Sequence, residues 1–453
     1  MPHKQVGGSG FQNLKSGTLA TWPPRASANG RYLVGDNGLP FLLVGDSPQP
    51  LFVNVSTTDA LTYYASRQGY GVNTLWVNLL CADYTFGRTD GKTFDLVAPF
   101  NTGSDPSTYD LSTPNSTYFS RMDTFIRTAE NYGIGFLLNP CETGGWLGTL
   151  SGNGNTASYN YGAFVGARYK NFPNIIWMNG NDFANYTDPT DAAYVEHVMQ
   201  GIADNDPYHL QTIELMAAAS IPQSTTSLDS TASAGLCTLN AAYSYDITYD
   251  ILRHGYGQSP TTPTFLVEAN YEGETLFSET DVPLRQRKQM WWTMTSGGCG
   301  HMFGGYPSYR LTTSPDWKVN LDATVVQNAA NTMKFLKTRR WFDLVPDTTN
   351  VFLTGGAGTY GTNNTRVNAS SYATAAVTAD GHFGLVYTPG SATLTIAMSK
   401  MAGATSARWY DPTNNTLGSL ITGSTIANSG THNFVASGNN NAGDPDWVLV
   451  LEA

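Results

Sequence analysis

The chain alternates short apolar runs with amphipathic stretches over most of its length. Counting from Phe41, there are eight such runs, at residues 41–44, 73–80, 134–138, 175–178, 210–215, 237–245, 264–268 and 300–303. Helical spacing fills most of the intervals, at residues 57–69, 118–132, 161–170, 194–203, 283–296 and 322–341. Eight strand–helix units predict an α/β fold, a (β/α)8 TIM barrel over residues 29–344. An open doubly wound sheet is the alternative, but no G-x-G-x-x-G motif follows the first strand.

The pattern changes after Trp341. Residues 345–453 carry short apolar or alternating runs separated by Gly, Asn, Pro and Asp, with no helical spacing between them. This pattern is typical of an antiparallel β-sandwich, so we expect a C-terminal sandwich domain at 345–453. Residues 1–28 precede the first strand pattern and are expected to form a loosely ordered lead-in.

Composition narrows the class of ligand. The 453 residues include 25 Tyr and 10 Trp but only 13% charged residues, with a net charge of −11 and no Lys/Arg cluster. A nucleic acid partner is therefore not expected, because phosphates require positive charge. A neutral carbohydrate fits better, since sugars stack on aromatic rings and hydrogen-bond to uncharged polar groups.

No run reaches the roughly 18 apolar residues of a membrane span, and the low Lys content favours an extracytoplasmic or secreted protein.

The four cysteines are Cys81, Cys141, Cys237 and Cys299, and they form no C-x-x-C pair. A structural zinc site is therefore not expected, and nothing in the sequence calls for another metal or a cofactor. Cys81 and Cys141 follow neighbouring predicted strands. A disulfide between them is left open, with buried free thiols as the alternative.

Acidic residues follow several predicted strands, at the end of a barrel where catalytic groups lie. Asp182 follows the fourth strand in Asn179-Gly180-Asn181-Asp182, and Glu268 directly ends the seventh. Glycoside hydrolysis requires two carboxyl groups on opposite sides of the scissile bond. We therefore predict Asp182 and Glu268 as the catalytic pair. A helix cap is the alternative role for Asp182, and Glu272 is the alternative to Glu268.

Other polar and aromatic residues at the predicted strand ends are candidates for substrate binding. The hydrogen-bonding candidates are Asp46, Asn78, Glu142, Asn181 and His301, and the candidate sugar platforms are Trp146, Tyr243 and Tyr271. Asp46 and Glu142 have helix capping as their alternative role, and the aromatic residues have ordinary loop packing. Glu214 and Tyr245 also fall at this rim. A serine triad is disfavoured because no G-x-S-x-G motif is present.

Several of these motifs occur together in one known family. Gly45-Asp46-Ser47, the loop at 139–146 (NPCETGGW), Gly180-Asn181-Asp182 and the segment 267–273 (VEANYEG) resemble the apiosidase-like glycoside hydrolases. The tail, with 407–412 (ARWYDP) and 446–451 (DWVLVL), resembles the domain described as the collagen-binding domain of a collagenase. The resemblance covers about residues 25–453.

The resemblance implies a catalytic (β/α)8 barrel with an appended β-sandwich, and an acidic pair that falls on Asp182 and Glu268. In the large clan of barrel glycosidases that this placement resembles, the acid/base follows strand four and the nucleophile follows strand seven. That clan has Asn-Glu where this chain has Asn181-Asp182, so the acid here has a shorter side chain. The predicted function is a glycoside hydrolase acting on a plant or microbial polysaccharide or oligosaccharide. The alternative is a non-catalytic carbohydrate- or matrix-binding protein on a barrel scaffold.

Overall fold

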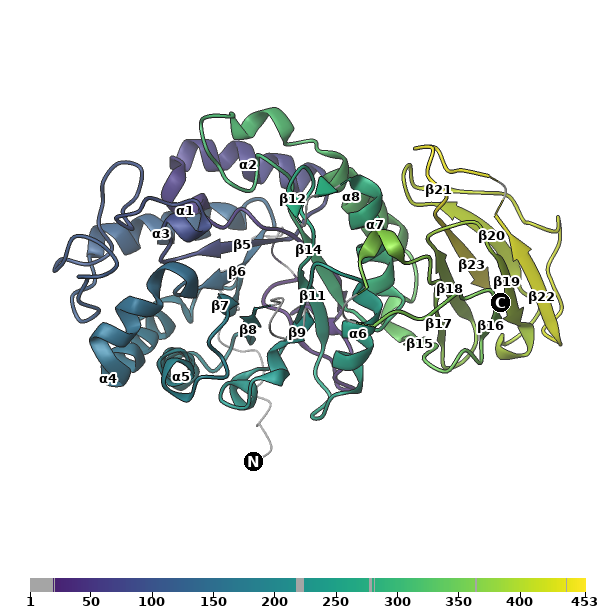
Figure 1. Ribbon diagram of the computed structural model, residues 1–453, viewed down its shortest axis with the longest axis horizontal. Helices are drawn as coiled ribbons and strands as arrows, with labels where there is room; N and C mark the ends of the chain where they lie inside the picture. The colour runs from purple at the N-terminus through teal and green to yellow at the C-terminus, as the bar shows by residue number, and fades with distance from the viewer. Residues whose placement is uncertain are drawn as a thin grey trace.

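The computed structural model describes residue 19 and residues 21–216, 224–276, 279–280, 282–362, 365–436 and 438–453. Most of the predicted lead-in, 1–28, lies outside these residues. Figure 1 shows two bodies side by side, a barrel formed by the first three quarters of the chain and a smaller β-domain formed by the last quarter. Within the described residues, no helix is long and apolar enough to cross a membrane.

All eight predicted barrel strands are present. They are β4 (Leu43–Asp46), β5 (Thr74–Asn78), β6 (Gly135–Asn139), β7 (Ile175–Phe183), β8 (Gln211–Leu215), β10 (Asn240–Ser244), β11 (Thr264–Glu268) and β14 (Gly300–Phe303). They lie in the order β8-β7-β6-β5-β4-β14-β11-β10, and each paired neighbour is parallel. Their apolar residues are buried on both faces, as strands covered by helices outside and by packed side chains inside require. The predicted (β/α)8 barrel is therefore confirmed.

The barrel closes between β8 and β10 without a regular ladder. A short strand, β9 (Ser224–Thr226), pairs antiparallel with β10, and the Thr225 hydroxyl donates to the Leu215 carbonyl at 2.8 Å. The Ser227 hydroxyl donates to the Ile213 carbonyl at 2.6 Å and accepts from the Ala241 amide at 2.9 Å. Side-chain hydroxyls thus supply the hydrogen bonds that a strand pair would otherwise make.

Helices surround the barrel (Figure 1). They are α1 (Leu51–Asn54), α2 (Thr57–Gly69), α3 (Ser116–Glu130), α4 (Thr143–Tyr169), α5 (Pro189–Asn205), α6 (Thr248–Gly257), α7 (Pro283–Met294) and α8 (Thr324–Leu336). Their starts follow capping chemistry: the Ser56 side chain accepts from the Asp59 amide at α2, and Asn115 does so from Thr117 at α3. Helix α4 is much longer than the predicted helix at 161–170, because it begins at Thr143 and continues through a kink at Gly154.

The C-terminal domain consists of two antiparallel sheets, as predicted. One has the strand order β15-β17-β18-β23-β20-β21, and the other has the order β16-β19-β22. The strands are β15 (Leu344–Pro346), β16 (Leu353–Gly355), β17 (Thr374–Thr378), β18 (Phe383–Thr388), β19 (Thr393–Ala397), β20 (Ser406–Asp411), β21 (Thr416–Leu417), β22 (Thr431–Val435) and β23 (Trp447–Glu452). Their apolar residues belong to one core that is continuous with that of the barrel.

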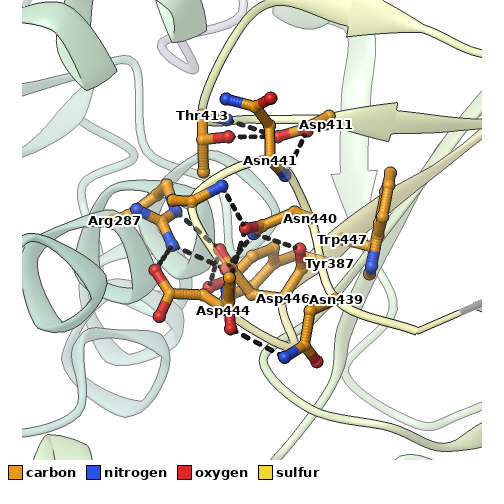
Figure 2. Close-up of polar contacts among 12 residues, drawn as sticks. Arg287, Tyr387, Asp411, Thr413, Asn439, Asn440, Asn441, Asp444, Asp446 and Trp447 are labelled. Atoms are coloured by element: carbon orange, nitrogen blue, oxygen red, sulfur yellow. Dashed lines mark hydrogen bonds and ion pairs between the residues drawn. The ribbon is translucent and has the colours of Figure 1, made fainter.

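Helix α7 joins the two domains. Trp291 stacks on Tyr387 of the sandwich with ring centroids 6.3 Å apart, and the indole nitrogen of Trp292 donates to the Tyr372 carbonyl at 2.9 Å. Arg287 reaches from the same helix into the loop before β23, where Figure 2 shows it between Asp444 and Asp446. The sandwich is therefore anchored to the helix that follows the seventh barrel strand.

Candidate active site

Three carboxylic acids meet at the rim formed by the ends of the barrel strands. Asp182 lies near the end of β7, Glu214 near the end of β8 and Glu268 at the end of β11. Glu214 is fully buried, Glu268 is 5% exposed and Asp182 is half-buried. None of their described contacts is to a Lys, Arg or His side chain. The rim therefore concentrates acid groups that no described Lys, Arg or His side chain contacts.

Glu268 is held by three tyrosine hydroxyls. Tyr245 donates to its Oε1 at 2.6 Å and Tyr243 to the same oxygen at 3.2 Å, while Tyr271 donates to Oε2 at 3.2 Å. Burial and the charge of Asp182 raise the pKa of Glu268 well above its usual range, and the tyrosine donors oppose that shift. Both oxygens of this carboxylate are thus fixed in position by hydroxyl donors.

Asp182 faces the same group of tyrosines. Tyr84 donates to its Oδ2 at 3.0 Å, and the Tyr243 hydroxyl, which donates to Glu268, also acts on the pKa of this carboxyl. Burial raises the pKa of Asp182, and the two tyrosines lower it in part.

The backbone that carries Asp182 is strained. Gly180, Asn181 and Asp182 all have positive φ, at 86°, 84° and 51°, and the register of β7 against β8 shifts between Gly180 and Phe183. Two consecutive non-glycine residues in this region are unusual and cost free energy that neighbouring contacts must supply. The Asn78 side chain supplies one by donating to Asn181 Oδ1 at 3.1 Å, and the Thr143 hydroxyl supplies another by donating to the Asn181 carbonyl at 2.9 Å.

Four of the predicted substrate-binding residues, Asn78, Asn181, Tyr243 and Tyr271, belong to this cluster. Their described side-chain contacts here are with other residues of the protein. Tyr243 and Tyr271 contact Glu268, and Asn78 contacts Asn181. All four are at least 96% buried. They build the site, and their contacts with a substrate stay a prediction.

The other predicted substrate-binding residues lie in the interior, with their polar groups used or enclosed. Asp46 is fully buried and forms an ion pair with Arg67 and a hydrogen bond with Tyr63. Glu142 caps α4, accepting from the Ala82 and Gly145 amides at 3.0 and 3.1 Å, and burial raises its pKa to about 8. Neither carboxylate is exposed to a substrate.

Trp146 and His301 are also enclosed. The Trp146 ring is fully buried and stacks on Tyr109 with centroids 5.7 Å apart, so it presents no free face to a sugar. Both His301 ring nitrogens are buried without a described partner, and burial lowers the pKa of this imidazole to about 4. The sequence pattern placed both residues at strand or loop ends but could not reveal that other side chains cover them.

Glu272, the alternative nucleophile, points away from the cluster. Its carboxylate accepts from the Val325 amide at the start of α8. Glu274 in the same loop is also engaged elsewhere, accepting from the Tyr309 hydroxyl at 2.9 Å. Neither makes a described hydrogen bond to Asp182 or Glu268.

Sequence reasoning did not choose three members of the cluster, which are Glu214, Tyr245 and Tyr84. Glu214 was noted at the fifth strand end but not chosen, and its contact with Asp182 depends on the pairing of β7 with β8. Tyr84 comes from the loop after β5 and carries no motif. Cys81 and Cys141 are free buried thiols, so the disulfide left open is not formed. In the described part of the chain, no three His, Cys, Asp or Glu side chains are grouped to hold a metal ion.

The comparisons with known proteins agree with this arrangement. The catalytic-domain family described as "Apiosidase-like, catalytic domain" matches residues 27–343, and the family described as "Putative collagen-binding domain of a collagenase" matches residues 362–452. No curated protein sequence matches the chain.

Solved structures share the two-domain fold. A structure named "Glycoside hydrolase" superposes with a TM-score of 0.77 at 21% identity, covering 95% of this chain and 96% of its own. A glycoside hydrolase family 5 protein from Bacteroides vulgatus ATCC 8482 gives 0.78 at 20% identity, covering 95% and 93%.

The barrel, its acid rim and the appended sandwich define a two-domain glycoside hydrolase. Within that class, the chain belongs to the apiosidase-like family.

Proposed function

We propose that this enzyme cleaves a glycosidic bond with retention of configuration, using Asp182 as the general acid/base and Glu268 as the nucleophile. The observation that carries the proposal is that the carboxyl groups of Asp182 and Glu268 meet at the rim of the barrel, each held by tyrosine hydroxyls. Retaining enzymes place their two carboxyl groups about 5–5.5 Å apart, whereas inverting enzymes need about 6.5–9.5 Å to admit a water. The direct nucleophilic role of Glu268 is therefore tested by the stereochemistry of the first product.

The reaction proceeds in two steps. Glu268 attacks the anomeric carbon and forms an ester, while the bond to the leaving oxygen breaks and Asp182 transfers its proton to that oxygen. Asp182, now ionised, takes a proton from water, which attacks the anomeric carbon and releases Glu268. The raised pKa of Asp182 keeps a proton available for the first step. The three tyrosine donors keep Glu268 oriented toward the anomeric carbon and favour its ionised form.

The substrate that we propose is a plant or microbial polysaccharide or oligosaccharide, met outside the cytoplasm. The low charge and abundant tyrosine of the chain suit a neutral, polyhydroxylated ligand. Tyr84 supports this reading, because it is 43% exposed beside Asp182 and offers a ring at the mouth of the site. A non-catalytic binding protein would have no need for three uncompensated acids at this rim.

The test is a screen of aryl glycosides and plant and microbial oligosaccharides with the wild type, Glu268→Gln and Asp182→Asn. We expect Glu268→Gln to lower kcat by at least about 10³-fold, and Asp182→Asn by about 10²- to 10⁴-fold. Proton NMR of the first product should show the anomeric configuration of the substrate. Glu272→Gln is the matched control, since it removes a nearby carboxylate that accepts a backbone amide. Near-normal turnover by Glu268→Gln, with loss in Glu272→Gln, would reject the assignment.

A further inference from the structure

The mechanism leaves one buried acid at the site without a role. Glu214 is fully buried, its Oε2 accepts from the Asp182 backbone amide at 2.9 Å, and its Oε1 has no described partner. Burying a carboxyl group with so few donors is costly, so a stability role alone does not account for it. Its one polar contact is with the residue assigned as the acid/base.

That contact joins two strands at their most irregular point. β7 leaves its regular pairing with β8 after Gly180, and the next two residues adopt positive φ. At Gly180, a Cβ atom would lie 2.3 Å from the Glu214 carbonyl oxygen, so only glycine allows the strands to approach this closely. The Asp182 amide is not part of the regular backbone hydrogen bonding between β7 and β8. It donates to the Glu214 carboxyl group, which takes the place of a backbone carbonyl as the acceptor.

We propose that Glu214 is a positioning residue for Asp182, an assignment that rests on the function proposed above. By accepting the Asp182 amide, it holds the left-handed turn that directs the short Asp182 side chain toward Tyr84 and Tyr243. An Asp reaches less far than a Glu by one methylene, and the turned backbone supplies the missing reach. Glu214 is thus the part of the site that lets an aspartate serve as the acid/base.

The electrostatic surroundings fit this role. The groups that face Glu214 are the acids Asp182 and Glu268 and the hydroxyls of Tyr84, Tyr243 and Tyr271. Burial, followed by the charges of Glu268 and Asp182, raises the pKa of Glu214 well above its usual range. A neutral Glu214 still accepts the amide through Oε2, so a glutamine should replace it faithfully.

The experiment compares Glu214→Gln, which keeps an acceptor oxygen, with Glu214→Leu, which keeps the volume and removes the acceptor. Crystal structures of both give the φ angles of residues 180–182 and the Tyr84–Asp182 contact. Turnover of the best glycoside from the screen gives kcat and KM. Thermal unfolding checks that each variant folds, and Glu214→Ala substitutes for Glu214→Leu if the latter does not. Glu272→Gln is again the control.

We expect Glu214→Gln to keep the turn and to stay within about threefold of wild-type kcat. Glu214→Leu should lose the turn, displace the Asp182 carboxyl and lower kcat by about 100-fold with little change in KM, the effect of a misplacement of about 1 Å. The proposal is overturned if Glu214→Leu keeps both the turn and the Tyr84 contact, or if the two variants lose kcat equally. If no glycoside is hydrolysed, the function proposed above fails, whereas the crystal structures still decide whether Glu214 holds the turn.

Discussion

Two groups of neighbouring carboxyl side chains in this molecule have opposite surroundings. Where the domains meet, Arg287 contacts Asp446 at 2.8 and 2.7 Å and Asp444 at 2.7 Å (Figure 2). At the barrel rim, Asp182, Glu214 and Glu268 lie together with tyrosine hydroxyls and backbone amides as their described donors. The first group is compensated by a cation, whereas no cation among the described residues contacts the second.

On the function proposed above, the difference between these two groups separates structural acids from catalytic ones. The interdomain group is completed by Asn440 and Tyr387, which donate to Asp446 at 2.7 and 3.2 Å, so its charges are fully used within the protein. Asp46, paired with Arg67, is of the same kind despite its place on a barrel strand. Asp182, the proposed acid/base, has a raised pKa that favours its protonated form, which is what a general acid requires.

Removing the cation should break the compensated cluster. Arg287→Met leaves Asp446 buried without its ion pair, so we expect the free energy of unfolding to fall by about 3–5 kcal/mol. Urea unfolding followed by tryptophan fluorescence measures the change. Arg340→Met is the control, because Arg340 pairs with Asp343 and Asp380 on the surface and its loss should leave stability nearly unchanged. An equal loss of unfolding free energy in Arg287→Met and Arg340→Met would contradict the expected difference between buried and exposed ion pairs.

His301 extends the comparison to a buried base without a counter-charge. Its pKa in the folded protein is lowered to about 4, below the roughly 6.5 of an unfolded histidine. The unfolded state therefore binds the proton first, and stability falls as the pH drops from about 6.5 to 4, by about 3 kcal/mol. His301→Leu should remove this part of the acid sensitivity, and His382→Gln, on an exposed histidine, should not. Unfolding free energies at pH 7 and pH 4.5 test this, and an unchanged difference in His301→Leu would contradict it.

Neutralising a rim acid should change the free energy of unfolding less than the loss of Arg287 does, and it should raise that free energy instead of lowering it. The folded-state pKa of Glu268 is raised, so its ionisation costs stability once the pH exceeds the unfolded value near 4.3. Glu268→Gln should therefore raise the free energy of unfolding by about 0.5–2 kcal/mol at pH 8 and by less at pH 5, while activity is lost. Glu196→Gln on α5 is the control. A destabilised Glu268→Gln would mean that the rim is compensated after all.

The sequence was sufficient for the eight barrel strands and for the positions of two acids near strand ends, whereas the extent of α4 was missed and α6 was not predicted. Apolar runs such as Ile175–Met178 alternate with helical patterns, so all eight strands were predictable, and the positions of Asp182 and Glu268 near strand ends followed. Partners distant in sequence were not predictable. Arg67 neutralises Asp46 from α2, and Tyr109 covers Trp146 from a loop, so two residues that looked available are not. Glu214 was passed over because only the β7–β8 register shows which residue it contacts.

The most direct test of the central claim is to trap the covalent intermediate. A 2-deoxy-2-fluoro glycosyl fluoride of the sugar hydrolysed in the screen should glycosylate the nucleophile, with fluoride leaving as the ester forms, and peptide mass spectrometry identifies the modified residue. The uncompensated rim predicts one adduct, on Glu268, with none in Glu268→Gln. An adduct on Glu214 or Glu272, or hydrolysis with inversion and no adduct, would contradict this account.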